Sequence, residues 1–433
     1  MTNLPHSNGS SGRTPCAASG PILFRAVRAA AMVLLSLSVR MSAGPPLTAP
    51  GEEPPDDATF DALLLEQIEQ LDQLGEIPDA DLAELLAEPT PRIRSWDYSA
   101  SVRLAAGHND NVVLSATHPE PSGFWLTGID AFLFRMPVDG REFSLMFMGD
   151  DVRYFSSPSA DKDQLFLTVA QIGQRTENGF ESGFELQHVY QDQILDASAT
   201  EFELFAVRAQ GHGLTGAPRF AANLAPGLRL RLDLPATRQW YRSPLDSFWE
   251  AGPRMELERS LADGSGKLSA GFAALWRPYD SRPQTSLDGF QAPGTNLRYQ
   301  RNRVHAGWQQ RWDAARRWQT SCKLAYDRNT DNGSGYFDYD RYHAAVQLAF
   351  RTDQWEARLR GTASYYAYDN QPASLEDPAM RRKTGLAVEV HLARSLSRRV
   401  RLYADYAREE SLANQPLEEY SVNKVLAGIE VEF

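Results

Sequence analysis

The sequence has 433 residues, of which 42% are hydrophobic and 23% charged, and its formal net charge is −12. It contains no apolar run of about 18 residues, which excludes a membrane-spanning helix. It also lacks a basic stripe, which excludes a nucleic-acid-binding protein. The cysteines are Cys16 and Cys322, so an internal disulfide is not expected once a leader has been removed.

The first element in chain order is a short apolar run from Ala29 to Val39. Arg25 and Arg28 precede this run, and Met41-Ser42-Ala43 follows it. This order of charged, apolar and small residues predicts a secretory signal peptide over residues 1–43. A lipoprotein anchor is not expected, because no cysteine follows the run.

An acidic segment comes next, and we expect residues 44–91 to be a periplasmic linker with two short helices. Residues 52–88 hold thirteen Asp or Glu and no Lys or Arg. Apolar residues recur in this segment at helical spacing, at Phe60, Leu63, Leu64, Ile68, Leu71 and Leu74, and again at Leu82, Leu85 and Leu86. Three roles remain open for it: a plug inside a barrel, a docking site for a periplasmic protein, or a solvated linker.

From Trp96 onward the apolar period changes to two, which predicts β-strands with one apolar face and one polar face. Residues 96–433 are expected to form one all-β domain. The sixteen predicted strands cover 96–106, 123–136, 141–155, 162–175, 178–191, 200–210, 224–240, 247–259, 266–278, 297–312, 316–328, 337–351, 353–368, 381–395, 398–410 and 419–433.

The predicted connections are alternately short and long, as periplasmic turns and outer loops are in membrane barrels. A short link is expected at Gly211–Ala217, and the long link at 279–296 could narrow a pore. Prolines make residues 200–245 the weakest region, and fourteen strands is the alternative there. The prediction is a closed antiparallel transmembrane β-barrel of about sixteen strands.

The last strand supports this prediction. Ile429, Val431 and Phe433 share one face, and Phe433 ends the chain. This ending resembles Gram-negative outer-membrane β-barrels, whose final strand closes on an aromatic residue. The resemblance implies a place in the cell outer membrane, contact with its lipid, and recognition of these three residues by the barrel-assembly machinery. A soluble all-β protein is the alternative, but its strands are usually only about five to six residues long.

Aromatic residues gather near the ends of the predicted strands. We expect them to form girdles at the membrane–water boundary, although aromatics favour strands in any protein. The residues concerned are Tyr154, Phe155, Trp240, Tyr241, Trp276, Tyr336, Tyr339, Tyr366, Tyr368, Tyr406 and Tyr420.

A barrel of sixteen strands can hold an aqueous lumen, and its polar face should line that lumen. The charges there either guide anionic solutes or pair across strands to brace the wall. The pore-lining candidates are Arg303, Arg341, Arg358, Arg360, Arg399, Arg401, Glu356 and Glu389.

Other chemistry is weakly indicated. Asp327, Asn329 and Asp331 alternate as in a calcium loop, but the glycine at 333 comes one place late and no helices flank them. We therefore expect a polar outer loop and no resident metal or cofactor. The histidines occur singly and no G-x-S-x-G motif is present, so an enzyme is not expected, although separate strands could still assemble a Ser–His–carboxylate site.

The segment Gly107-His108-Asn109-Asp110-Asn111-Val112 resembles the opening of barrels associated with exopolysaccharide export, over about six residues. Asn and Asp are also ordinary turn residues. The leading functional hypothesis is a channel for hydrophilic solutes. The alternatives are an accessory barrel for export or assembly of an exopolysaccharide or surface protein, and an outer-membrane enzyme.

Overall fold

The computed structural model describes residues 96–433, except 139, 158, 177–178, 197–205, 262–264, 314, 316 and 375–377. The predicted signal peptide and acidic helices therefore lie outside the described residues. Across the described part of the chain, no helix is long and apolar enough to cross a membrane.

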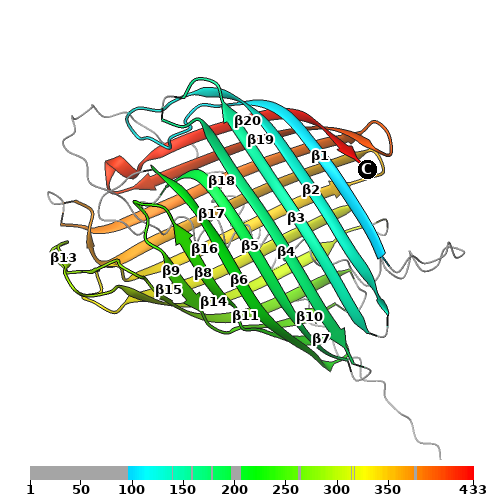
Figure 1. Cartoon of the computed structure of the whole chain (residues 1–433), viewed down its shortest axis with the longest axis horizontal. Coiled ribbons are helices and arrows are strands. Elements are labelled where there is room, and N and C mark those ends of the chain that lie inside the picture. The colour runs from blue at the N-terminus through cyan, green and yellow to red at the C-terminus, as the bar shows by residue number, and fades with distance from the viewer. Residues whose placement is uncertain are drawn as a thin grey trace, which may run out of the picture. The chain divides into compact units, whose positions relative to one another are not determined.

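The described residues form a closed antiparallel β-barrel, which confirms the predicted fold class. Neighbouring strands pair in chain order, except that β7 and β8 both pair with β6, β7 pairs onward with β10, and β9 pairs with β11. β1 also pairs with β20, from Ser101 opposite Glu432 to Asn109 opposite Lys424. Figure 1 shows these two strands side by side. The strand segments of this sheet are β1 (Trp96–Asn109), β2 (Ser122–Val138), β3 (Arg141–Tyr154), β4 (Lys162–Arg175), β5 (Phe180–Asp196), β6 (Ala206–Ala225), β7 (Leu228–Asp233), β8 (Ala236–Tyr241), β9 (Phe248–Ala251), β10 (Arg254–Ser260), β11 (Gly266–Pro278), β14 (Arg298–Arg311), β15 (Trp318–Asp331), β16 (Tyr339–Arg351), β17 (Trp355–Pro372), β18 (Met380–Ser395), β19 (Val400–Ala413) and β20 (Tyr420–Glu432).

β7 and β8 follow one another along a single strand position, and so do β9 and β10, so the eighteen segments occupy sixteen strand positions around the barrel. Prolines cause both interruptions, because a proline cannot donate a ladder hydrogen bond. Pro235 separates β7 from β8, and Pro253 separates β9 from β10. The ladder continues through the proline carbonyls, which accept hydrogen bonds from the N–H groups of Gly252 and Ala274.

The prediction was wrong over residues 206–217. The expected strand end at 210 and the expected short link Gly211–Ala217 are replaced by the long strand β6, which begins at Ala206. Its glycines are not turn residues: a Cβ on Gly211 would lie 2.6 Å from the ring of Tyr241, and one on Gly213 would lie 2.5 Å from the side-chain oxygen of Gln239. Glycine is used here for close packing across strands.

Connections alternate as expected. Short turns join β2 to β3, β4 to β5 and the later alternate pairs at one rim, where β1 begins and β20 ends. Longer loops join the strands at the opposite rim, which we call the loop rim. The longest loop lies between β11 and β14 and contains the small hairpin of β12 (Gln284–Thr285) and β13 (Gln291–Ala292). One short helix, η2 (Pro416–Glu418), precedes β20.

The two faces of the barrel differ in polarity. Residues directly opposite in an antiparallel sheet share a face, so the registers assign each side chain to the outside or the lumen. Large apolar side chains are exposed on the outside of nearly every strand, among them Leu104, Trp125, Leu324, Leu359, Leu402 and Val425. The inner face carries most of the charged residues. This arrangement lets strands cross a bilayer without leaving an open edge.

Candidate functional site

The inner wall from β17 to β20 holds an open cavity of about 270 Å³. Strand alternation places basic and acidic side chains together there, because each of the four neighbouring strands presents every second residue to the lumen. The lining residues are Arg358, Arg360, Glu389, Val390, His391, Asp405, Tyr406, Ala407, Lys424 and Leu426.

The arginines of this wall have different surroundings. The Arg358 side chain is 45% exposed, and its nearest carboxylate, on Glu356, is 3.4 Å away. Arg360 lies 3.9 Å from Glu389. Arg401 is held more closely, between Glu356 at 2.9 Å and Glu430 at 2.5 Å. Arg358 is therefore the arginine of this group most available to a passing solute.

Arg399 does not belong to this wall as predicted. β19 begins at Val400, so Arg399 lies in the turn before it, where its backbone N–H donates to Ser397 Oγ. Its side chain is exposed, and its carbonyl accepts the backbone N–H of Glu432. The serine-rich turn takes up a residue that strict alternation had assigned to a strand.

Arg303 and Arg341 lie farther round the barrel and brace the wall. Arg303 makes two hydrogen bonds to the Asp327 carboxylate, at 2.5 and 3.1 Å, and Arg341 approaches the same group at 3.9 Å. Asp327 is only 1% exposed. Of the two roles that the sequence left open for lumen charges, pairing across strands holds here.

This geometry also accounts for the segment that resembles a calcium loop. Asp331 accepts backbone N–H groups of Gly333, Gly335 and Phe337, and Asn329 donates to the Phe337 carbonyl. The oxygens therefore organise a turn. Within the described ranges, no group of three or more His, Cys, Asp or Glu could hold a metal ion. Burial raises the pKa of Asp338 in the same loop.

Several aromatics predicted for the membrane girdle lie inside. Tyr336, Tyr339, Tyr366 and Tyr368 are buried at the loop rim of the lumen, whereas Trp240, Trp276 and Tyr406 are exposed on the outside as expected. Strand alternation decides whether a side chain faces the lumen or the lipid. The even-numbered residues of β17 face the lumen, so Tyr366 lies on the inner face with Arg358 and Arg360. An alternation count at each tyrosine could have revealed this.

One side of the loop rim is packed by a buried hydrophobic cluster that is aromatic except for Leu297: Phe248, Tyr279, Leu297, Tyr299, Tyr336 and Phe337. Arg282, from the long β11–β14 loop, stacks on Phe337 at 4.8 Å and on Tyr279 at 5.2 Å. Hydrogen bonds from Gln284 and Ser334 tie this loop to the β15–β16 loop. The long loop thus packs onto its neighbour at the mouth, a detail that its length alone could not show.

An apolar patch inside the lumen was also missed. It lies on β3, β4 and β5 and consists of Leu167, Val169 and Val189 with Met146, Met148 and Leu165 packed around them. The middle parts of β3 and β4 are apolar on both faces in the sequence, so alternation does not single out the inward side chains there. We refer to these six residues as the apolar lumen patch.

A serine and a histidine meet on the wall between β16 and β17. Ser364 Oγ lies 2.8 Å from His343 Nδ1, and Arg341 donates to the same hydroxyl at 3.2 Å. A cationic donor on the oxygen lowers its nucleophilicity, which is the opposite of serine activation. The contact therefore gives no support to hydrolysis.

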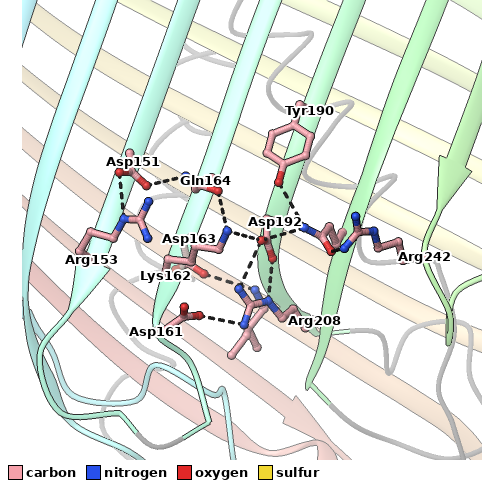
Figure 2. A network of polar contacts seen from close by, with 12 residues as sticks. Asp151, Arg153, Asp161, Lys162, Asp163, Gln164, Tyr190, Asp192, Arg208 and Arg242 are labelled. Atoms are coloured by element: carbon pink, nitrogen blue, oxygen red, sulfur yellow. Dashed lines mark hydrogen bonds and ion pairs between the residues drawn. The ribbon is translucent and has the colours of Figure 1, made fainter.

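The outer face near the loop rim carries a separate polar network (Figure 2). Asp192 is its centre: Lys162 approaches at 2.9 Å and Arg208 at 2.6 Å, and Gln210 donates at 3.2 Å. These residues come from β4, β5 and β6, so the network joins three strands. Arg208 also reaches Asp161 in the β3–β4 loop, where hydrogen bonding to Arg208 lowers the pKa of Asp161 despite some burial.

The opening segment that resembles export-associated barrels helps to close the sheet. The Asp110 carboxylate accepts both the backbone N–H and the side-chain amide of Asn423, each at 2.7 Å. Asn111 donates to the carbonyl of Ser421. These contacts attach the first loop to the last strand, so a structural role explains these polar residues.

A closed barrel that is apolar outside and charged inside defines the class of the protein, a β-barrel of the outer-membrane type. No protein-family model matches the chain, and a search of curated proteins found no match.

Solved outer-membrane proteins are similar in structure. OccAB1 of Acinetobacter baumannii is 10% identical, with 80% of this chain and 99% of that chain covered and a TM-score of 0.43. OprB of Pseudomonas putida is 10% identical, with 81% and 96% covered and a TM-score of 0.44. The channel DcaP of A. baumannii is 12% identical, with 78% and 97% covered and a TM-score of 0.44. At these values, nothing about the activity of this chain follows from the similarity.

Proposed function

We propose that this protein is a channel that lets hydrophilic solutes cross the outer membrane without chemical change. The observation that carries the proposal is the closed barrel of sixteen positions with a charged inner wall. Barrels of sixteen strands are wide enough for an aqueous path, whereas barrels of eight are filled by their own side chains.

The cavity along β17–β20 would set the preference among solutes. Arg358 and Arg360 face it, together with Lys424 from β20. Glu389 and Asp405 also line it. Their negative charges offset part of the positive charge of the wall, so an anion would be bound by the basic side chains but only weakly. We expect a mild preference for anions, because Arg358, Arg360 and Lys424 outnumber the carboxylates Glu389 and Asp405 around this cavity and Arg358 is its more exposed arginine.

Single-channel recording in planar bilayers tests the proposal. The refolded protein should give ion-conducting steps, and the reversal potential in a salt gradient should move toward cation preference in the double variant Arg358→Gln/Arg360→Gln. Arg399→Gln, at the exposed turn, is the matched control and should leave the reversal potential unchanged.

A folded barrel that conducts no ions, both as the full chain and with the acidic segment 52–88 deleted, would refute the channel. That outcome would favour the accessory barrel for export of a polysaccharide or surface protein. We also propose that Ile429, Val431 and Phe433 are read by the barrel-assembly machinery, since Phe433 is 68% exposed at the end of β20.

A further inference from the structure

The polar network on the outer face has an arginine at each end (Figure 2). Arg153 lies on β3, opposite Lys162 on β4. Arg242 directly follows β8, and its backbone N–H donates to a carbonyl of β6, so it continues the ladder between these strands. Arg208 and the central Asp192 lie between the two ends. Basic side chains thus extend across the outer face from β3 to β8.

The two end arginines keep hydrogen-bond donors that the network does not use. Arg153 donates from Nε to Asp151 at 2.9 Å, and its side chain is 52% exposed. Arg242 is exposed and donates from Nη1 to the neutral side chain of Gln210 at 2.8 Å. No other described residue contacts the remaining guanidinium N–H groups of either arginine. Those donors are available to an acceptor from outside the protein.

The middle of the network is satisfied by its own carboxylates. Lys162 and Arg208 both contact Asp192, which is only 1% exposed, and Arg208 also reaches Asp161. The charges of these two basic residues are therefore used to join the strands. Binding of an external anion falls to Arg153 and Arg242.

The network lies at the level of the lipid headgroups in the outer leaflet. The rim of short turns is the periplasmic side of an outer-membrane barrel, so the loop rim faces outward. Tyr190, His212 and Trp240 lie opposite one another on β5, β6 and β8, two residues closer to the membrane centre than Asp192 and Gln210. Aromatic side chains of this kind mark the membrane–water boundary. The side chains just beyond them therefore meet headgroups.

We propose that Arg153 and Arg242 bind the phosphates of lipopolysaccharide, the glycolipid of the outer leaflet, whose acylated disaccharide is phosphorylated at both ends. A guanidinium group binds a phosphate through paired N–H donors. Four strand spacings of about 4.8 Å place the two arginines roughly 19 Å apart at the backbone, and their long side chains can lean toward each other. Two separated arginines suit a headgroup with two separated phosphates. The inference goes beyond the proposed channel and does not rest on it.

The extent of the polar patch favours a lipid over a second copy of the chain. The charged side chains are confined to the loop-rim end of β3–β6. Toward the membrane centre, beyond the stacked pair His188 and His212, the same outer face is mainly apolar, with Phe147, Phe166 and Leu186. Acyl chains require such a surface below a polar headgroup. An interface between two barrels would instead extend over the height of the wall.

Another part of the outer face near the loop rim has the opposite charge pattern. Arg328 on β15 lies 3.3 Å from Asp340, 2.6 Å from Asp369 and 3.8 Å from Asp338. Three carboxylates surround one arginine there, so a phosphate would be repelled. Arg328 therefore supplies a matched control for an arginine on the outer face that does not bind lipid phosphate.

Lipid binding to the refolded full-length protein in detergent, measured by native mass spectrometry, tests the proposal. Arg153→Gln/Arg242→Gln should weaken the affinity for lipopolysaccharide by about tenfold or more, because charge-assisted hydrogen bonds to phosphate are lost. Arg328→Gln should bind like the unaltered protein. The unaltered protein should also bind dephosphorylated lipopolysaccharide about tenfold more weakly. Electrophoretic mobility without boiling shows that each variant has folded.

Equal affinity of the double variant and the unaltered protein would overturn the proposal. Equal binding of phosphorylated and dephosphorylated lipopolysaccharide would overturn it as well, and that comparison needs no variant. If phosphatidylglycerol or inorganic phosphate competes as well as lipopolysaccharide, the assignment to the outer-leaflet glycolipid fails. Cross-linked dimers of Arg153→Cys in membranes, in a Cys322→Ser background, would identify an interface between barrels instead. Binding is measured without ion flow, so a barrel that binds the glycolipid but conducts no ions would remove the channel proposal alone.

Discussion

The buried carboxylate of Asp327 offers the sharpest test of how the wall is held together. Replacing it with Asn keeps the volume and removes the charge that Arg303 and Arg341 share. At about 3 Å and an effective dielectric constant near 20, one ion contact has a gross Coulomb energy of about 5 kcal/mol. Desolvation offsets part of this, and removing one partner of a buried pair costs about 3–5 kcal/mol.

We expect Asp327→Asn to lower the free energy of unfolding by about 3 kcal/mol, the low end of that range, because Arg303 makes further contacts. Glu389→Gln is the matched control. Its carboxylate is about half exposed and lies 3.9 Å from Arg360, so the expected cost is below about 1 kcal/mol.

Urea unfolding of the barrel in lipid vesicles, followed by tryptophan fluorescence and by electrophoretic mobility without boiling, measures both variants. The double variant Asp327→Asn/Arg303→Gln should lose less stability than the two single losses added together, because the pair is coupled. Equal stability of Asp327→Asn and Glu389→Gln would refute the assignment of a bracing role to Asp327.

Three further predictions concern the outer face, a loop and the chain end. Asp192→Ala should lower the free energy of unfolding by about 1–3 kcal/mol in the same urea assay. This is less than for a fully buried ion pair, because solvent screens the partly exposed Arg208. An unchanged free energy of unfolding would mean that the outer network does not stabilise the barrel. Hydrogen bonds from Ser157 and Ser159 lower the pKa of Glu120 from its ordinary 4.5. The contribution of the Glu120 carboxylate to loop stability is therefore present above pH 4.5 and is lost as the pH falls through the lowered pKa. Glu120→Gln should therefore speed loop proteolysis at pH 7 and make little difference well below pH 4; an equal effect at both would contradict this. Phe433→Ala should reduce the amount of barrel assembled in cells at least threefold while refolding in detergent proceeds normally, and unchanged assembly would remove its role as a signal.

The sequence predicted the architecture because one physical rule repeats in every strand. Lipid outside and charge inside enforce a period of two, and that pattern placed most strand boundaries within a few residues. It failed where glycine and proline have two meanings. Gly211 and Gly213 resembled a turn but make room for Tyr241 and Gln239, and Pro235 interrupts a strand without ending it.

The candidate site was only partly predictable. Parity assigned Arg358, Arg360 and Glu389 to the lumen, and the structure gathers them around one cavity. Alternation along one strand could not show which arginine is paired with a carboxylate, because that pairing depends on the register of the neighbouring strand. Arg303 lies directly opposite Asp327, whereas Arg358 lies opposite Ala349 and His391. The apolar lumen patch was not predicted because the middle parts of β3 and β4, which supply five of its six residues, are apolar on both faces.

Stability and selectivity are therefore divided around the wall. On β14–β16 an arginine meets a buried carboxylate and is fixed, so its charge is mostly neutralised before any solute arrives. On β17–β20 the cavity keeps Arg358 at 45% exposure, where it can exchange water for an anion. Neutralising Arg303 should then cost stability with little change in reversal potential, and neutralising Arg358 should do the reverse.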